Sequence, residues 1–223
     1  MNNDEFEQAK TIPYYDEFMK TCLEFDNLTM DDYVNFMANI LPIILTRKEK
    51  EPIVLFEEVI EALRGQWIAS AELPFHGPWH HAILPAVLIT ALRNNDYTFN
   101  EKDIREAFLR GAKIPAGACG FCGVCGAGTG LGIAISIVER SNPFRDSVRT
   151  HAFEAASKAN ERIGKLGGPR CCRLSSYMSL GLAKTLLQEL NLPLPEAKLI
   201  GRCKVHSLNT QCHEQKCPYY PRR

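Results

Sequence analysis

Apolar residues recur along most of the chain at the spacing of helices, and turn-forming residues divide them into segments. Thr29-Met30-Asp31-Asp32 resembles a capping box, with an acid in place of Glu, ahead of the apolar stretch YVNFMANIL. Pro42 is expected to break or kink that helix, because proline lacks the N–H that a helix interior needs. A second helix is predicted from Glu51-Pro52 to about Leu63, since proline is tolerated near a first turn.

The remaining helices are predicted from caps, from apolar runs and from the glycines and prolines that end them. They run from about His80 to Arg93, from a cap at Asn100 to about Ala112, from near Thr129 to Asn142-Pro143, over residues 145–165, and from Ser175 or Ser176 to Asn191. Strand-like alternation is scarce, so we expect an all-α fold. We predict an N-terminal helical segment over residues 1–50, a single helical core domain over 51–200 and a short cysteine-rich tail over 201–223.

Composition and charge narrow the class of protein. The 223 residues suffice for one domain with a core, and 26 acidic residues balance 26 basic ones, so no overall field recruits nucleic acid or an anionic membrane. The acidic start MNNDEFEQAK is unlike a signal peptide, and the longest apolar run, Ala82 to Leu92, is too short to span a bilayer. We expect a cytoplasmic protein whose partner is a small-molecule substrate or a redox partner, with no nucleic acid and no membrane. The oligomeric state is left open.

Cysteine is the residue type that points to chemistry. The chain has nine: Cys22, Cys119, Cys122, Cys125, Cys171, Cys172, Cys203, Cys212 and Cys217. An odd number fits a disulfide framework badly, and clustered cysteines in a cytoplasmic chain favour a metal site or catalysis. Cys22 stands alone, and we interpret it as a buried, inert thiol.

The stretch GACGFCGVCGAGTG holds three thiols with two residues between successive ones. Thiolates are soft ligands that select zinc, copper(I) or iron–sulfur clusters. The spacing of Cys119, Cys122 and Cys125 matches the opening of a bacterial ferredoxin motif, but Thr129 stands where the fourth cysteine would be. A [4Fe–4S] cluster is favoured over zinc, whose structural sites usually combine two short pairs of ligands. The fourth ligand must come from elsewhere, or one iron stays open.

A glycine follows each of these thiols. Gly120, Gly123 and Gly126 are expected to adopt positive φ and to aim backbone N–H groups at an anionic cluster. The helix predicted from near Thr129 would add its positive end.

Cys171 and Cys172 lie between two predicted helices in GGPRCCRLSS, and one of them is a candidate for the additional cluster ligand. Arg170 and Arg173 flank the pair, and they could neutralise the cluster or hold a substrate carboxylate through paired hydrogen bonds. The alternative interpretation is a helix start with one buried cysteine and two solvated arginines.

The polar tail offers Cys203, His206, Cys212 and Cys217 as soft or borderline ligands, with His213 in reserve. So short a segment cannot hold itself by a core, which favours a second metal site with zinc or a second cluster. The alternative is a flexible tail with unpaired thiols.

The stretch FHGPWHH holds His76, His80 and His81. The last two fall in the first turn of a predicted helix, whose positive end disfavours protonated imidazole. Neutral histidine suits a general base or a metal ligand. The alternative is a capping and packing loop anchored by Trp79.

Three stretches resemble a known family. HGPWHHAILPAVLITAL, GACGFCGVCGAGTG and GPRCCRLSSYMSLGLA are similar to an uncharacterised cysteine-rich prokaryotic family, a domain of unknown function. This resemblance covers roughly residues 50–220 and implies no established activity.

A further similarity is to the α chain or domain of the iron–sulfur serine dehydratases. Residues 84–88, LPAVL, resemble their L-P-x-V-L helix, and residues 123–127, GVCGA, resemble their glycine-cysteine segment. A later cysteine corresponds to Cys171 or Cys172. The similarity implies an all-α fold and a cluster with one iron free of cysteine, which acts as a Lewis acid on a substrate hydroxyl or thiol. Three clustered cysteines and the histidine stretch depart from that pattern, so Cys125 alone is carried across as a ligand.

Together these features predict an iron–sulfur lyase that eliminates water or sulfide from a small carboxylate-bearing substrate. A histidine of the set His76, His80 and His81 would move the proton, and Arg170 or Arg173 would hold the carboxylate. The alternatives are a non-catalytic iron–sulfur redox or carrier module and a zinc-stabilised scaffold.

Overall fold

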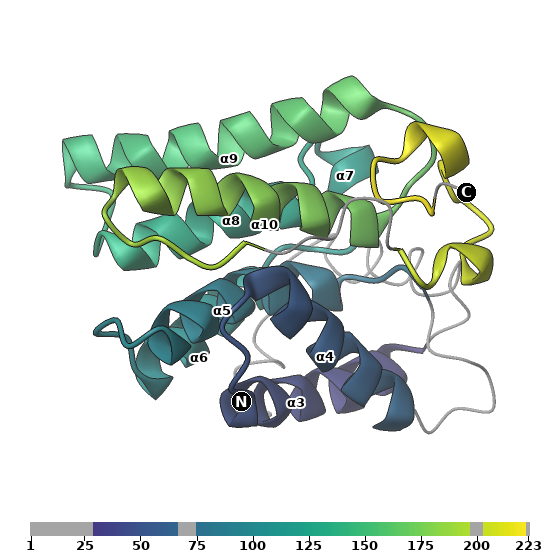
Figure 1. The fold of residues 1–223 in the computed structure, drawn as a ribbon, viewed down its shortest axis with the longest axis horizontal. Helices are drawn as coiled ribbons and strands as arrows, with labels where there is room; N and C mark the ends of the chain where they lie inside the picture. Colours follow the sequence, from purple (N-terminus) through teal and green to yellow (C-terminus); the bar gives the residue numbers. More distant parts are fainter. Residues whose placement is uncertain (1–28, 67–74, 197–202, 222–223) are drawn as a thin grey trace.

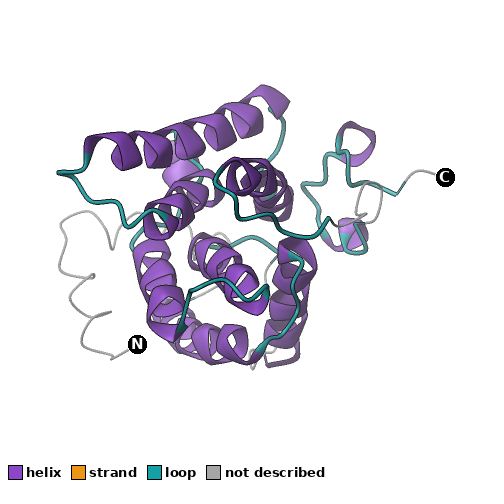
Figure 2. Ribbon diagram, turned by 60° about the vertical axis from the view of Figure 1, so that its left-hand side comes forward, coloured by secondary structure: helices purple, strands orange, loops and turns teal. Residues whose placement is uncertain are grey.

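A computed structural model describes residues 29–66, 75–196 and 203–221, and Cys22 lies outside these ranges. Within them the chain forms eight α-helices, two short 3₁₀ helices and no strand, which confirms the all-α prediction (Figures 1 and 2). The α-helices are α3 (Met30–Thr46), α4 (Pro52–Gln66), α5 (Trp79–Asn94), α6 (Glu101–Ala112), α7 (Ala118–Phe121), α8 (Gly126–Val138), α9 (Asp146–Leu166) and α10 (Cys172–Glu189). The 3₁₀ helices, η1 (His206–Leu208) and η2 (Glu214–Lys216), lie in the tail.

Side-chain caps start two of the helices where the sequence places them. Thr29 Oγ1 accepts the backbone N–H of Asp32 at 3.1 Å, and the Asp32 carboxylate accepts the backbone N–H of Thr29 in return. Asn100 and Asp103 form the same reciprocal box at the start of α6. These bonds satisfy N–H groups that a helix leaves without internal partners, so they fix where each helix begins.

Other helix boundaries differ from the prediction. Pro42 does not break α3, because buried residues on both sides, among them Leu41 and Ile43, hold the last turn against the core. Helix α8 begins at Gly126 rather than near Thr129, and α10 begins at Cys172 rather than at a serine. The short helix α7, within the cysteine loop, was not predicted.

Helix α5 is the centre of the fold. Every residue from Ala82 to Leu92 is buried, and α5 contacts α3, α4, α6, α8 and α10. Figure 2 shows helices surrounding a central one. Buried side chains of α3, such as Tyr33 and Met37, belong to the same hydrophobic core, so residues 30–46 fold as part of the single domain.

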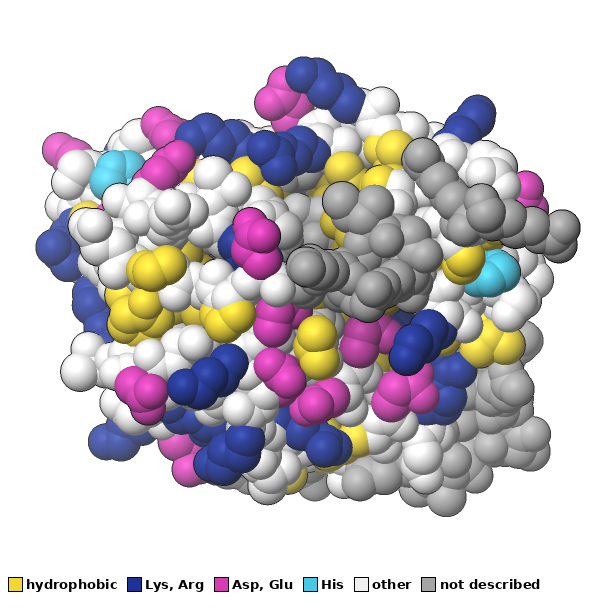
Figure 3. Space-filling model, in the orientation of Figure 1, with side chains coloured by type: hydrophobic (Ala, Val, Ile, Leu, Met, Phe, Trp, Pro, Cys, Tyr) yellow, Lys and Arg dark blue, Asp and Glu magenta, His cyan; other side chains and the backbone are white. Residues whose placement is uncertain are grey.

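The candidate site residues of the tail and of the start of α10 gather at one end of this bundle. Figure 1 places the yellow C-terminal tail beside α7 and the first turns of α10. None of the described helices is long and apolar enough to cross a membrane. On the face shown in Figure 3, basic and acidic side chains are interspersed, in keeping with the balanced charge of the chain.

Candidate metal centre

Two cavities adjoin the Cys171-Cys172 pair. The loop cavity has a volume of about 260 Å³ and lies between the cysteine loop, the end of α9 and the start of α10. Its lining includes His81, Cys119, Cys125, Arg170 and Cys172. The tail cavity, of about 20 Å³, lies between α10 and the tail, and its lining includes Cys171, Arg173, Cys203, His206, Cys212 and Cys217. Cys171 and His213 border both cavities.

The cysteine loop presents two of its three thiols to the loop cavity. Cys119 lies in α7, and Cys125 is the N-cap residue of α8. The backbone N–H of Cys125 donates to Oδ1 of Asn160 in α9 at 2.6 Å, which ties the loop to the neighbouring helix. Cys122 is exposed and does not line the cavity.

The glycines of the loop serve different purposes from those predicted. Among the glycines that follow the thiols, Gly123 alone has positive φ, at 69°. Gly120 lies inside α7 and Gly126 is the first residue of α8, so the prediction of positive φ is wrong for both. At Gly126 the requirement is space, because a Cβ there would lie 2.1 Å from the His81 ring. Gly117, at φ 73°, takes the left-handed conformation that allows α7 to begin.

Cys171 precedes α10 and borders both cavities, whereas Cys172 is the first residue of α10 and borders the loop cavity. Cys171 is the N-cap, and its Sγ accepts the backbone N–H of Leu174 at 3.4 Å. Burial raises the pKa of Cys171 to about 11. Burial, with a smaller contribution from the neighbouring Cys125 thiol, raises the pKa of Cys172 to about 12. Cys172 therefore lies close to the cysteine loop, as expected for an additional ligand.

The three histidines of FHGPWHH divide by position. His76 and His80 are buried, whereas His81 lines the loop cavity. The Nδ1–H of His81 donates to the carbonyl of Ile114 at 3.1 Å, so Nε2 remains as the proton-accepting atom. Burial lowers the pKa of His81, which keeps the imidazole neutral at pH 7.

His76 connects the core to the tail. A backbone N–H can only donate, so the contact from Cys172 N at 3.4 Å makes Nδ1 the acceptor and places the proton on Nε2. Nε2–H then donates to Oδ1 of Asn209 at 3.1 Å. Burial, with Arg170 nearby, lowers the pKa of His76 to about 4. His76 is thus a buried, neutral side chain that links the core to the tail.

The two arginines also lie in different surroundings. Arg170 is half-buried and lines the loop cavity. Arg173 is buried in the tail cavity, where its guanidinium pairs with Glu57, which also accepts from the Tyr177 hydroxyl. Burial alone would lower the pKa of Arg173, but the neighbouring groups, with Glu57 foremost among them, together outweigh burial and raise it. Of the two arginines, Arg170 is the one placed beside the cysteine loop.

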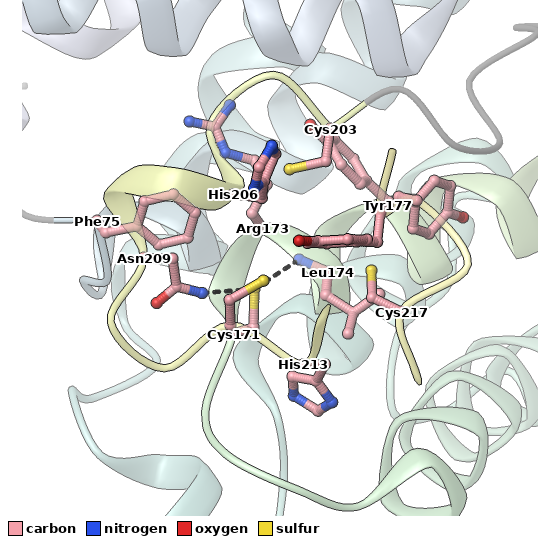
Figure 4. Close-up of a pocket in the computed structure, with 13 residues that line it drawn as sticks. Phe75, Cys171, Arg173, Leu174, Tyr177, Cys203, His206, Asn209, His213 and Cys217 are labelled. Carbon is pink, nitrogen blue, oxygen red and sulfur yellow. Dashed lines mark hydrogen bonds between the residues drawn. The ribbon is translucent and has the colours of Figure 1, made fainter. Parts of the chain in front are cut away.

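Thiols from distant parts of the sequence line the tail cavity. Figure 4 shows the sulfur atoms of Cys171, Cys203 and Cys217 directed into the space between α10 and the tail. Cys212 lines the same cavity. Burial raises the pKa of both Cys203 and Cys217. All four cysteines are free thiols.

The donor sets fit soft metals, although the thiols stand apart from one another. Among the described residues, no three His, Cys, Asp or Glu side chains are arranged to hold a metal ion as they stand. Four thiols border each cavity, with Cys171 common to both, which is the ligand chemistry of iron–sulfur clusters and zinc. Binding in either place would require the thiols to lose protons and to move inward.

Asn160 and Asn209 support the two cavities, and sequence reasoning missed both. Asn160 anchors the backbone of Cys125, and Asn209 joins His76 to the sulfur of Cys171. An asparagine in a polar helix and one in a polar tail carry no signal of their own. Their roles follow from contacts between residues far apart in the sequence.

Comparison with known proteins assigns the family. The profile of a family of unknown function, DUF5714, matches residues 40–220, which include every thiol of both cavities. The chain belongs to this family. No curated protein and no solved structure matches it. Membership in DUF5714 confirms the predicted resemblance to a family of unknown function, and the comparisons add no support for similarity to the serine dehydratases.

Proposed function

We propose that this DUF5714 protein binds an iron–sulfur cluster in the loop cavity through Cys119, Cys125 and Cys172, and acts as a lyase. The observation that carries the proposal is that residues from separate parts of the sequence line one cavity. Thiols from the cysteine loop and from the start of α10 border it together with a neutral histidine and an arginine. Three thiol ligands suit a [4Fe–4S] cluster with one iron free of cysteine.

The surroundings of the cavity favour an anionic group. Cys125 is the N-cap of α8, and Cys172 is the first residue of α10. The positive ends of both helices therefore face bound thiolates and sulfides. Arg170 adds a full positive charge on the same lining. When bound, the cluster would supply an open iron that acts as a Lewis acid on the leaving oxygen or sulfur.

The reaction that these groups suit is elimination from a small hydroxy or thiol acid. Arg170 would hold the carboxylate, and Nε2 of His81 would accept a proton from a carbon of the substrate. The electron pair of that C–H bond forms the new C=C bond as the C–O or C–S bond breaks. The leaving group departs with the transferred proton as water or hydrogen sulfide, so atoms and charge balance.

The first test is cluster content in protein purified anaerobically, measured as iron, acid-labile sulfide, and visible and electron paramagnetic resonance spectra. Cys119→Ser, Cys125→Ser and Cys172→Ser should each lose or destabilise the cluster. Cys122→Ser is the matched control, because Cys122 belongs to the same loop but does not line the cavity. Unchanged iron and sulfide in all three lining variants would end the proposal.

The second test concerns the catalytic role. Small hydroxy and thiol acids should shift the spectra of the wild-type cluster and of His81→Gln alike, because the variant keeps the thiols. The variant should turn over any substrate so found about 10²–10⁴-fold more slowly, the usual contribution of a general base. A spectrum that no such acid shifts would count against an open iron.

A non-catalytic redox or carrier module is the second candidate, and the position of Cys122 favours it. This thiol is exposed and lies between Cys119 and Cys125 in the sequence, so a rearranged loop could bring it to the cluster as a fourth ligand. Loss of the cluster in Cys122→Ser, with reversible reduction of the wild type, would support full cysteine coordination and exclude the lyase.

A further inference from the structure

We propose that the tail cavity is a separate metal site, in which Cys171, Cys203, Cys212 and Cys217 hold one zinc ion that fastens the tail to the core. Three of these thiols belong to the tail, and Cys171 is the N-cap of α10. A shared ion would therefore join two parts of the chain that a polar segment alone joins weakly. The tail cavity adjoins the loop cavity at Cys171 and His213, but the zinc site uses none of the thiols proposed for the cluster and does not depend on it.

The size and ligands of the cavity favour a single ion. Its volume of about 20 Å³ is close to that of one water-sized sphere, whereas the loop cavity has about 260 Å³. Four cysteines around one ion form the tetrahedral thiolate set typical of structural zinc. The four residues between Cys212 and Cys217 also fall within the usual spacing of zinc ligands.

Hydrogen-bond donors already point at two of the sulfur atoms. Cys171 Sγ accepts from the backbone N–H of Leu174 at 3.4 Å and from Nδ2 of Asn209 at 3.5 Å (Figure 4). Cys212 Sγ accepts from the backbone N–H of Glu214 at 3.3 Å. Such donors stabilise the negative charge of metal-bound thiolates and orient them. Three hydrogen-bond donors directed at two sulfur atoms are more than inert thiols require.

Arg173 provides a compensating charge. Four thiolates carry more negative charge than a divalent ion neutralises, so a nearby cation would stabilise the site. The Arg173 side chain lines the tail cavity and is 3% exposed. One terminal nitrogen pairs with Glu57, while the buried Nε has no hydrogen-bond partner among the described residues. This leaves a buried donor at the edge of the cavity.

Hydrogen bonds of Asn209 and His213 tie the tail to the core, but the tail buries little apolar surface. Within residues 203–221, Val205, Asn209 and Cys217 are the buried ones. The Tyr219 ring packs on Tyr177 of α10 at 4.9 Å between ring centres, which is a single aromatic contact with the core. So small an apolar surface does not order a segment of this length, whereas a structural zinc ion does.

The site differs in one ligand from the set predicted for the tail, which had His206 in place of Cys171. His206 lines the same cavity, and its ring lies 4.9 Å from that of Tyr220.

Substitution of single ligands distinguishes the set with Cys171 from the set with His206. Zinc should be counted in the full chain by native mass spectrometry, in a Cys119→Ser/Cys125→Ser background that removes thiols of the loop cavity.

In that background we expect about one zinc ion per chain, as for other structural sites. Replacing Cys171, Cys203, Cys212 or Cys217 by Ser should remove it, and His206→Ala should keep it. Zinc retained in Cys171→Ser would overturn the assignment. If His206→Ala lost zinc at the same time, His206 would be the fourth ligand instead. A chain without zinc whose tail thiols are oxidised to disulfides would also overturn it.

A second measurement covers variants that fail to fold. Cobalt(II) added to the metal-stripped double variant should give visible absorption typical of tetrahedral thiolate coordination, and zinc should abolish that absorption. This experiment leaves the four tail-cavity thiols intact. No thiolate-to-cobalt absorption, in a chain whose circular dichroism still shows its helices, would refute the site.

Discussion

The imidazole of His80 is held neutral by its surroundings. It is 2% exposed, its ring lies beside those of Phe56 and Trp79, and Nδ1–H donates to the carbonyl of Gly77 at 2.9 Å. Burial lowers the pKa of His80 well below its ordinary value, although the bond to Gly77 opposes this. The folded protein therefore leaves His80 uncharged under conditions in which the unfolded chain protonates it.

We predict that this histidine makes stability depend on pH. Because the folded pKa is depressed, stability is complete above the unfolded value of about 6.5 and falls as the pH drops below it. One such group costs about 2 kcal/mol between pH 7 and pH 5. Urea unfolding at several pH values should show a smaller decline in His80→Leu than in the wild type. Equal slopes would mean that His80 is protonated in the folded state.

Gly126 is a residue whose role is space rather than conformation. A Cβ there would lie 2.1 Å from the His81 ring, so Gly126→Ala must displace His81 or shift α8. We expect a loss of about 1–3 kcal/mol in the free energy of unfolding, as for other overpacked sites. Chemical denaturation measures it.

Gly120→Ala is the matched control for this prediction. Gly120 is also helical and follows Cys119, but a Cβ there meets nothing within 4 Å. Its substitution should be neutral or slightly stabilising, since alanine favours a helix over glycine. Equal losses in the two variants would show that the loop requires glycine for its backbone, as the glycine after each thiol predicts.

At the scale of elements, α8 and α9 pack closely through a glycine. A Cβ on Gly132 would lie 2.8 Å from the Ala152 carbonyl oxygen and 2.9 Å from Cβ of Ala156. Gly132→Ala should therefore force the helices apart and destabilise the fold by about 1–3 kcal/mol. Gly164→Ala, on open surface of α9, should instead stabilise it by up to about 1 kcal/mol. The melting temperatures of both variants test these two predictions. A Gly132→Ala variant as stable as the wild type would contradict the close packing of α8 and α9.

The sequence predicts elements best where local interactions decide them. Asn100 starts α6 because its capping box lies within four residues, and glycines after α9 end that helix close to the predicted residue. The start of α10 is predicted at a serine because its N-cap is a cysteine, Cys171; the helix start confirms that part of the alternative interpretation of the cysteine pair. Pro42 does not break α3, since tertiary packing of this helix outweighs one missing hydrogen bond.

At the scale of the whole molecule, the candidate sites depend on contacts that local patterns do not encode. The sequence predicts the ligand types and that Cys171 or Cys172 joins the cysteine loop, without choosing between the two. It does not predict that Cys171 also borders the tail cavity beside thiols of the tail, because adjacent residues at a helix start point in directions that only the fold defines. The same holds for the three histidines of FHGPWHH, of which only His81 borders the loop cavity.

The last prediction separates the stability of the core from that of the tail. The core is built from α3 to α10, and Tyr219 is the described tail residue that packs against it. Removing zinc should therefore loosen the tail while the core stays folded. In hydrogen exchange of the full chain, the Cys203 amide, bonded to the Tyr219 carbonyl at 2.7 Å, should exchange faster after chelation.

Amides of α5 are the internal reference for this measurement, because α5 lies at the centre of the core. Their exchange should not change, and restoring zinc should restore protection of the tail. The urea midpoint of the helices should move little, since ligand binding stabilises only the states that contain the bound site. Faster exchange throughout α5 would show instead that the metal holds the whole fold together. An unchanged Cys203 amide would show that the tail is ordered without it.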